Sequence, residues 1–137
     1  MGSEVQSERR IIEVVGAVLR DGDRYLLGQR AAHKSQGGLW EFVGGKIEPG
    51  ETPEEALARE CREELALEIE EVVPVGSVVH EYADKTIRLA LLSCRPVAGS
   101  VPRALEHQQI RWVTREEMEG LPLAPADREL LVQLKLS

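Results

Sequence analysis

The strongest constraint on the fold of this chain is a glycine-rich loop that runs directly into a well-marked helix start. Three glycines fall within residues 44–50, and glycine permits backbone conformations that bring a chain close to a ligand. Thr52 can cap a helix, Pro53 suits its first position, and Glu55 lies three residues after the cap. Together these residues form the pattern of a capping box. We therefore predict a loop over residues 44–51 and a helix over residues 53–65.

The acidic residues of the chain are concentrated in the same region. The formal charge of the 137 residues is −7, and residues 48–71 alone contain ten acidic and two basic side chains. This sign of charge argues against a general binder of nucleic-acid polymers or anionic membranes, which usually has a basic surface. No apolar run approaches the ~20 residues of a membrane span, and residues 1–10 lack the apolar region of a signal peptide. With only Cys61 and Cys94 and no secretory signal, we expect a reduced, cytoplasmic protein.

Strand patterns surround the loop and the helix. The β-branched and apolar runs predict strands over residues 11–19, 24–30, 72–82, 86–95 and 110–113, with short extended pieces at 40–43. A short helical turn is expected after Thr114, and an amphipathic helix over residues 125–136. Mixed strands with two helices separated by the sheet predict an α/β/α layered domain. We expect a single domain over residues 1–137, with residues 1–9 as a flexible tail.

Three acidic residues of the predicted helix, Glu60, Glu63 and Glu64, fall on one side, beside the apolar seam rather than opposite to it. Such a group can be a solvated charged face with Arg59 and Arg62 as partners. It can also be a carboxylate cluster for a hard divalent cation such as Mg²⁺, which often joins carboxylates to substrate phosphates. The glycine loop favours the second interpretation, because it lets backbone groups approach a ligand.

Taken as a unit, the loop and helix have the pattern G-x5-E-x7-R-E-x-x-E-E, which begins at Gly45 and ends at Glu64. This pattern resembles the Nudix box of the Nudix hydrolase family, here residues 45–67. The flanking segment around Trp40 resembles the MutT-like branch, and its pattern is nearest to the CTP pyrophosphohydrolases. Two positions depart from the box. Cys61 stands at a bulky apolar site, and Ala66 replaces a final glycine that ends the helix in a left-handed conformation.

The resemblance implies a Nudix fold, an α/β/α sandwich with a mixed sheet and a catalytic loop-helix-loop. It implies Mg²⁺-dependent hydrolysis of a (d)NTP to the (d)NMP and diphosphate, with Mn²⁺ as a substitute, in the sanitation of the nucleotide pool. (d)CTP or 5-modified cytidine triphosphates are the expected substrates, and 8-oxo-dGTP is the alternative. A non-catalytic nucleotide-binding module is the alternative of another class. The expected partner is a small nucleotide rather than a nucleic-acid polymer or a membrane, and the protein is expected to be a monomer or a homodimer.

The resemblance also implies roles for individual residues of the metal and catalytic set. That set is Gly44, Arg59, Glu60, Glu63, Glu64 and Glu106. Glu60, Glu64 and the Gly44 carbonyl are implied metal ligands, and Glu63 a further ligand or proton acceptor. Glu106, from an E-H-x-x-x-x-W segment, is implied as a ligand or general base. Arg59 is expected to orient carboxylates, including Glu51, rather than touch the substrate.

The implied substrate-binding residues are Arg30, Lys46, Tyr82 and Asp127. Arg30 matches the family's triphosphate-contacting arginine, and Lys46 beside the glycines is placed to meet phosphate. Tyr82 is expected to stack on the base, or else to be an ordinary strand aromatic. Asp127, if ionised, can only accept hydrogen bonds and would favour an exocyclic amine such as cytosine N4. The plain alternative for Asp127 is an acid stabilised by a helix dipole.

Overall fold

The computed structural model describes residues 10–134 of the chain. The strands are β1 (Ile11–Asp21), β2 (Arg24–Gln29), β3 (Trp40–Phe42), β4 (Gly44–Lys46), β5 (Ile69–Glu81), β6 (Thr86–Pro96) and β7 (Gln109–Thr114). The helices are α2 (Pro53–Leu65), α3 (Arg115–Glu119) and α4 (Pro125–Gln133). The predicted tail at residues 1–9 and the predicted last residues of the final helix, 135–136, lie outside the described residues. In the described part of the chain, every helix is too short or too polar to cross a bilayer.

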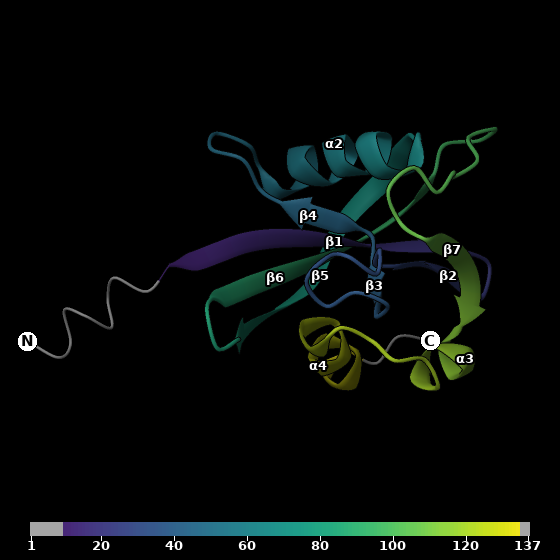
Figure 1. Cartoon of the computed structure of the whole chain (residues 1–137). Coiled ribbons are helices and arrows are strands. Elements are labelled where there is room, and N and C mark those ends of the chain that lie inside the picture. Colours follow the sequence, from purple (N-terminus) through teal and green to yellow (C-terminus); the bar gives the residue numbers. More distant parts are fainter. Residues whose placement is uncertain (1–9, 135–137) are drawn as a thin grey trace, which may run out of the picture.

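The strands form one mixed sheet between two helical layers. The order is β3-β2-β1-β6-β5, with β4 paired to β1 and β7 paired to β2. β1 and β6 are parallel, from Ile11 opposite Thr86 to Leu19 opposite Cys94, and the other strand pairs are antiparallel. Helix α2 covers one face of the sheet, and α3 and α4 cover the other (Figure 1). The predicted α/β/α architecture is therefore confirmed.

Each face of the sheet has its own apolar core. Under α2 the buried side chains include Val15, Val43, Leu57, Cys61 and Leu65. Under α3 and α4 they include Phe42, Leu91, Met118, Leu130 and Leu131. Cys61 thus fills an apolar site in the α2 core, and burial raises the pKa of its thiol well above the ordinary value.

The ends of α2 follow the local signals of the sequence. The Thr52 hydroxyl accepts from the Glu55 N–H at 3.1 Å, and the Glu55 carboxylate accepts from the Thr52 N–H at 2.9 Å. This reciprocal capping box confirms the predicted start of the helix. At the other end Ala66 adopts the left-handed conformation, with φ 53°, and the Leu67 N–H donates to the Cys61 carbonyl. Helix α2 therefore ends in a left-handed C-terminal cap of the kind that glycine usually forms, here with an alanine.

One expectation about the loop before α2 is wrong. Residues 44–46 are not loop but the short strand β4, in which Gly44 pairs with Gly16 and Gly45 with Val15 of β1. A Cβ on Gly44 would overlap the Val15 carbonyl oxygen. The glycine therefore allows a close backbone approach that any side chain would prevent. This pairing fixes the start of the acidic loop to the central strand.

Candidate active site

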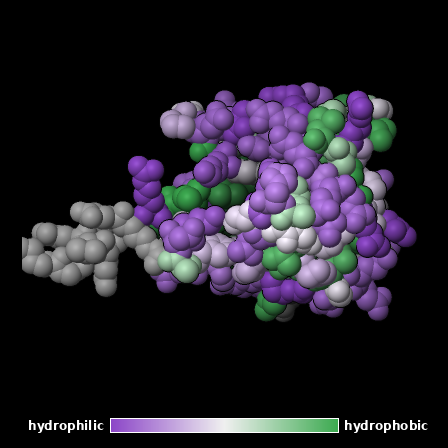
Figure 2. Space-filling view, in the orientation of Figure 1, coloured by the Kyte–Doolittle hydropathy of each residue, from purple (hydrophilic) through white to green (hydrophobic). Residues whose placement is uncertain are grey.

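Two adjoining pockets open beside β3 and β4. The first, of about 210 Å³, is lined by all four predicted substrate-binding residues, Arg30, Lys46, Tyr82 and Asp127, and by Gly44. The second is small, and its lining contains three acidic side chains, two basic ones and a histidine: Arg30, Ala31, Lys34, Glu41, Glu64, Glu106 and His107. Arg30 and Glu41 belong to both linings, so they form the wall that the two pockets share. In Figure 2 the surface over α2 is largely hydrophilic, and hydrophobic residues show in the hollow beneath it.

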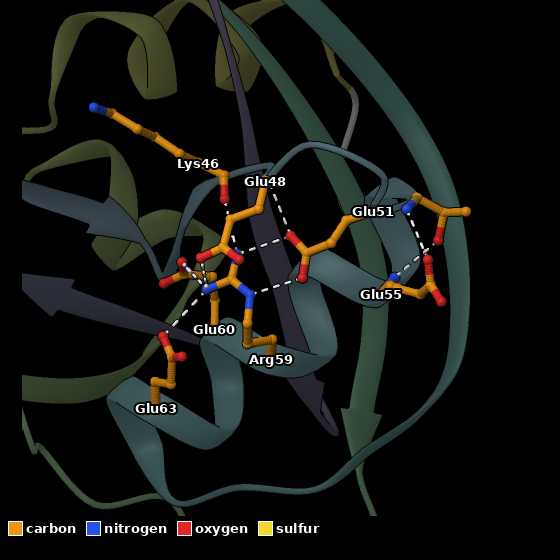
Figure 3. A network of polar contacts seen from close by, with 8 residues as sticks. Lys46, Glu48, Glu51, Glu55, Arg59, Glu60 and Glu63 are labelled. Atoms are coloured by element: carbon orange, nitrogen blue, oxygen red, sulfur yellow. Dashed lines mark hydrogen bonds and ion pairs between the residues drawn. The ribbon is translucent and has the colours of Figure 1, made fainter.

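Arg59 is the centre of a network of carboxylates (Figure 3). Its Nη1 lies 2.8 Å from Glu60 Oε1 and 3.2 Å from Glu63 Oε2, and its Nη2 donates to the Lys46 carbonyl at 3.0 Å. The predicted contact with Glu51 is present, at 2.7 Å and 2.9 Å. The guanidinium lowers the pKa of Glu51 to about 2, so this acid is ionised whenever the protein is folded near neutral pH. Arg59 contacts carboxylates and backbone and is not part of either pocket lining.

Glu60 and Glu63 approach Arg59 from the helix but differ in exposure. The Glu60 side chain is largely covered, whereas that of Glu63 is 55% exposed. The carboxyl of Glu60 lies against β4, where a Cβ on Gly45 would come within 2.7 Å of it. Gly45 therefore leaves the space that Glu60 occupies, which explains why the box begins with a glycine at this position.

Glu64 is the buried acid of the group. Its Oε2 is buried and has no hydrogen-bond partner among residues 10–134. Burial raises the pKa of this carboxyl to about 9, helped by a hydrogen bond and charge repulsion from Glu60 and by the charges of Glu41 and Glu106. A nearby cation stabilises the ionised form of a buried carboxyl that lies close to other carboxylates. This set of oxygen donors therefore suits a hard divalent metal ion.

The carboxylates of the described residues do not converge on one point. Among the described residues, no three His, Cys, Asp or Glu side chains are arranged to hold a metal ion. In the network of Figure 3, Glu60 and Glu63 turn toward Arg59. Glu106 reaches the same region from another element, the segment before β7. Its neighbour Leu105 donates its N–H to the Glu64 carbonyl at 3.1 Å, and Glu106 shares the second pocket with Glu64.

Asp127 lies in the first turn of α4, buried against β3. Its Oδ1 accepts from the Phe42 N–H at 3.0 Å. Burial, followed by the charge of Glu41, raises the pKa of this carboxyl to about 8. Asp127 is therefore mainly protonated at neutral pH, and the expectation of an ionised, acceptor-only side chain is corrected. A neutral carboxyl can donate through its hydroxyl as well as accept.

Arg30 and Tyr82 line the first pocket from opposite parts of the sheet. Arg30 is held by Glu41, at 3.1 Å, and by the Ser35 carbonyl, which accepts from Nε at 2.7 Å. Tyr82 follows β5, and burial raises the pKa of its phenol. Lys46 is exposed at the end of β4.

Glu41 and His107 are two pocket residues that sequence reasoning did not include among the candidates. Glu41 stands between the buried Trp40 and Phe42 in β3. A charged residue inside so short an apolar strand is a signal that could have singled it out. His107 is buried and bonded to Glu41. It is the histidine of the E-H-x-x-x-x-W segment, but its separation from the other histidines has no ligand pattern, and its contact with Glu41 becomes evident only in the fold.

Comparison with known proteins identifies the family. Residues 14–133 match the model of the NUDIX domain. The chain is 43% identical over 122 residues to the CTP pyrophosphohydrolase of Escherichia coli (strain K12), with 89% of this chain and 90% of the relative covered. It is 29% identical over 121 residues to the 8-oxo-dGTP diphosphatase of the same organism, with 88% and 93% covered. The crystal structure of the MutT NUDIX hydrolase from Burkholderia pseudomallei matches with a TM-score of 0.83 and 26% identity, over 93% of this chain and 100% of that one.

The chain belongs to the Nudix hydrolase family. The resemblance inferred from the box, the fold and the enzyme class are thereby confirmed. The family generally uses a divalent metal and acts on small nucleotides, which agrees with the three glutamates of the second pocket beside the first.

Proposed function

We propose that the protein is a nucleoside triphosphate pyrophosphohydrolase that converts a (d)NTP and water to the (d)NMP and diphosphate. (d)CTP or 5-modified cytidine triphosphates are its preferred substrates. The observation that carries the proposal is the shared wall of Arg30 and Glu41 between a pocket with three glutamates and a pocket with aromatic and polar lining. A nucleotide can place its base in one and its phosphates beside the other. The 43% identity to a CTP pyrophosphohydrolase supports the cytidine preference.

In this proposal Arg30 and Lys46 bind the phosphates, and Tyr82 and Asp127 contact the base. The metal is Mg²⁺, or Mn²⁺ in its place, and the residues that would hold it are Glu60, Glu63, Glu64, Glu106 and the Gly44 carbonyl. When bound, it neutralises the polyphosphate and lowers the pKa of the attacking water. Arg59 orients the helix carboxylates and offsets their mutual repulsion. Glu63 or Glu106, both exposed, can accept the proton of the water.

The state of Asp127 keeps 8-oxo-dGTP as a second candidate substrate. An ionised Asp127 would favour an exocyclic amine, but the buried carboxyl with a pKa of about 8 also offers a hydroxyl donor. The Asp127 carboxyl can therefore donate a hydrogen bond to an acceptor on the base, and it can also accept one from an exocyclic amine. The 8-oxo-dGTP diphosphatase among the relatives supports this alternative.

We further propose that the protein acts as a single Nudix domain on free nucleotides in the cytoplasm, without a nucleic-acid polymer or a membrane. It works as a monomer or a homodimer. Light scattering coupled to gel filtration distinguishes the two assemblies. Failure of single- or double-stranded DNA to compete for the site supports a nucleotide-sized ligand.

The experiment that tests the function is a diphosphate-release screen over normal and damaged (d)NTPs, each with Mg²⁺, with Mn²⁺ and with a chelator. We expect cytidine triphosphates to give the highest kcat/KM and chelation to abolish release. Faster turnover of 8-oxo-dGTP than of every cytidine substrate would replace the first candidate by the second. Tight nucleotide binding with no turnover under any condition would indicate the non-catalytic module instead. Asp127→Asn tests the base contact, because an unchanged substrate ranking would remove Asp127 from the specificity pocket.

A further inference from the structure

His107 occupies a space that exists only because residue 28 is a glycine. The His107 side chain is 4% exposed, and a Cβ on Gly28 would come within 2.5 Å of its ring carbon Cδ2. Gly28 is central in its part of the sheet, paired with Glu41 of β3 on one side and Ile110 of β7 on the other. The imidazole therefore packs against the β2 backbone at Gly28, where there is no side chain. Any side chain at residue 28 would displace the ring.

The polar contact of the ring points toward the shared wall of the two pockets. His107 Nε2 lies 3.0 Å from Glu41 Oε2, and Glu41 also contacts Arg30 Nη1 at 3.1 Å. A carboxylate oxygen accepts hydrogen bonds, so a ring that bonds to Glu41 donates through Nε2. The other ring nitrogen, Nδ1, is buried and has no partner within residues 10–134. The Glu41 contact therefore sets the orientation of the ring.

The segment that includes His107 is fixed on both sides by backbone contacts. The Leu105 N–H donates to the Glu64 carbonyl at 3.1 Å, and the Gln108 N–H donates to the Gln29 carbonyl at 2.9 Å. Between these two anchors lie Glu106, whose side chain is exposed, and His107, whose side chain is buried. Both side chains line the second pocket from this anchored segment, so a displacement of the buried ring shifts the backbone that carries Glu106.

We propose that His107 is a positioning residue that holds Glu106 toward Glu64, and that the His107–Glu41–Arg30 contacts tie this segment to the substrate-binding arginine. This inference rests on the proposed function of Glu106 at the metal site. His107 does not touch the substrate in this scheme. It acts through Glu106, in the way that residues supporting a metal ligand maintain its orientation.

The first test is kinetic and uses His107→Ala. Loss of a support behind a metal ligand lowers metal affinity or activity by about 10- to 100-fold. We expect kcat to fall by about this factor, with KM for the nucleotide changed by less than about 3-fold, and Mn²⁺ binding followed by paramagnetic resonance to weaken. His107→Gln, whose amide can donate to Glu41, should recover part of the loss. His33→Ala, in the exposed loop between β2 and β3, is the matched control and should behave as wild type.

A double-mutant cycle separates this inference from the function on which it rests. If His107 acts through Glu106, His107→Ala should lower kcat much less in a Glu106→Gln background than in the wild type. Fully additive losses, or a wild-type kcat in His107→Ala when Glu106→Gln is impaired, would overturn the positioning role alone. A wild-type kcat in Glu106→Gln would overturn the role of Glu106 and the inference with it, while the activity of the wild-type protein would still stand.

A second cycle tests the steric part of the argument. Gly28→Ala should displace the ring and reproduce the fall in kcat. In a His107→Ala background the added methyl group meets an empty space, so Gly28→Ala should then have little further effect. An equal effect of Gly28→Ala with and without the ring would contradict the proposal. Thermal unfolding of each variant identifies any loss that comes from unfolded protein.

Discussion

Arg59 and Glu51 form a two-point ion pair, with Nε 2.7 Å from Oε2 and Nη2 2.9 Å from Oε1. Glu51 Oε1 also accepts from the Glu48 N–H at 2.9 Å. The same guanidinium therefore closes the loop between β4 and α2 and, through Nη1, orients Glu60 on the helix. Loop shape and carboxylate position depend on one side chain.

Replacing Arg59 by lysine should impair turnover although the charge is retained. An ammonium group is a point charge and cannot reproduce the planar fork that meets both oxygens of Glu51. We expect kcat/KM to fall by about 10-fold or more, measured by diphosphate release with saturating Mg²⁺. Arg62→Lys is the matched control, because Arg62 is exposed and its contact to Glu68 spans 3.9 Å. Equal activity of the two variants would show that the fork is dispensable.

Glu64→Gln should remove activity without loss of stability. We expect turnover to fall at least ~100-fold, as loss of proton transfer or metal positioning should produce. The fold should tolerate the change, because burial already disfavours the ionised form of this carboxyl, whose pKa is about 9. Glu54→Gln, in the exposed first turn of the same helix, serves as the control. Near-normal rates with Mg²⁺ in Glu64→Gln would remove the assignment of this residue.

Asp127→Asn should change how stability depends on pH. The folded pKa of about 8 lies above the ordinary value of 3.8, so between these values the folded protein holds a proton that the unfolded chain releases. The free energy of unfolding then falls as pH rises from about 4 to 8, by up to about 1.4 kcal/mol per pH unit. The variant lacks this proton, and its amide oxygen can still accept from Phe42.

The measurement for Asp127→Asn is urea unfolding at intervals from pH 4 to pH 8. We expect the variant to become progressively more stable than the wild type as pH rises. Asp84→Asn, in the exposed turn between β5 and β6, should follow the wild-type profile. A stability difference that stays constant across the range would mean that the carboxyl is ionised in the folded protein.

Ala66→Gly should stabilise the protein by about 1 kcal/mol, because Ala66 holds the left-handed conformation that glycine adopts without a Cβ penalty. The residue is exposed, so the lost methyl group leaves no cavity. Ala58→Gly, inside the same helix, should have the opposite sign and cost about 1 kcal/mol. Chemical unfolding at one pH gives both values. Destabilisation of similar size in both variants would contradict the structural reading of the helix end.

The sequence predictions are correct where the interactions join residues close in the sequence, and they fail where the interactions join distant residues. Helix α2 has the predicted bounds, because its capping residues lie within three positions of one another. The sequence predicts loop at strand β4, since the pairing of this strand depends on a backbone approach to Val15 that has no local signal. The protonation of Asp127 depends on burial and on the charge of Glu41 in the distant strand β3, and neither has a local signal in the sequence.

The four predicted substrate-binding residues share one pocket, because the family pattern contains information on distant contacts that composition and periodicity do not. Glu41 and His107 show the converse. They are 66 residues apart and meet only in the folded sheet. Neither is a sequence-based candidate: Glu41 is one charge in a short apolar strand, and His107, although it follows Glu106 in the E-H-x-x-x-x-W segment, has no metal-ligand spacing.

The parallel pairing of β1 with β6 affects the order in which the molecule forms. Ile11 meets Thr86, and contacts of this kind join residues 75 positions apart, such as Glu13 and Arg88. Strand β4 and helix α2 both lie in the sequence between β1 and β6. Closing so long a stretch loses chain entropy before the strand contacts compensate for it, which slows folding. The capping contacts of α2 are local, whereas the sheet that the helix covers is complete only when β6 has paired with β1.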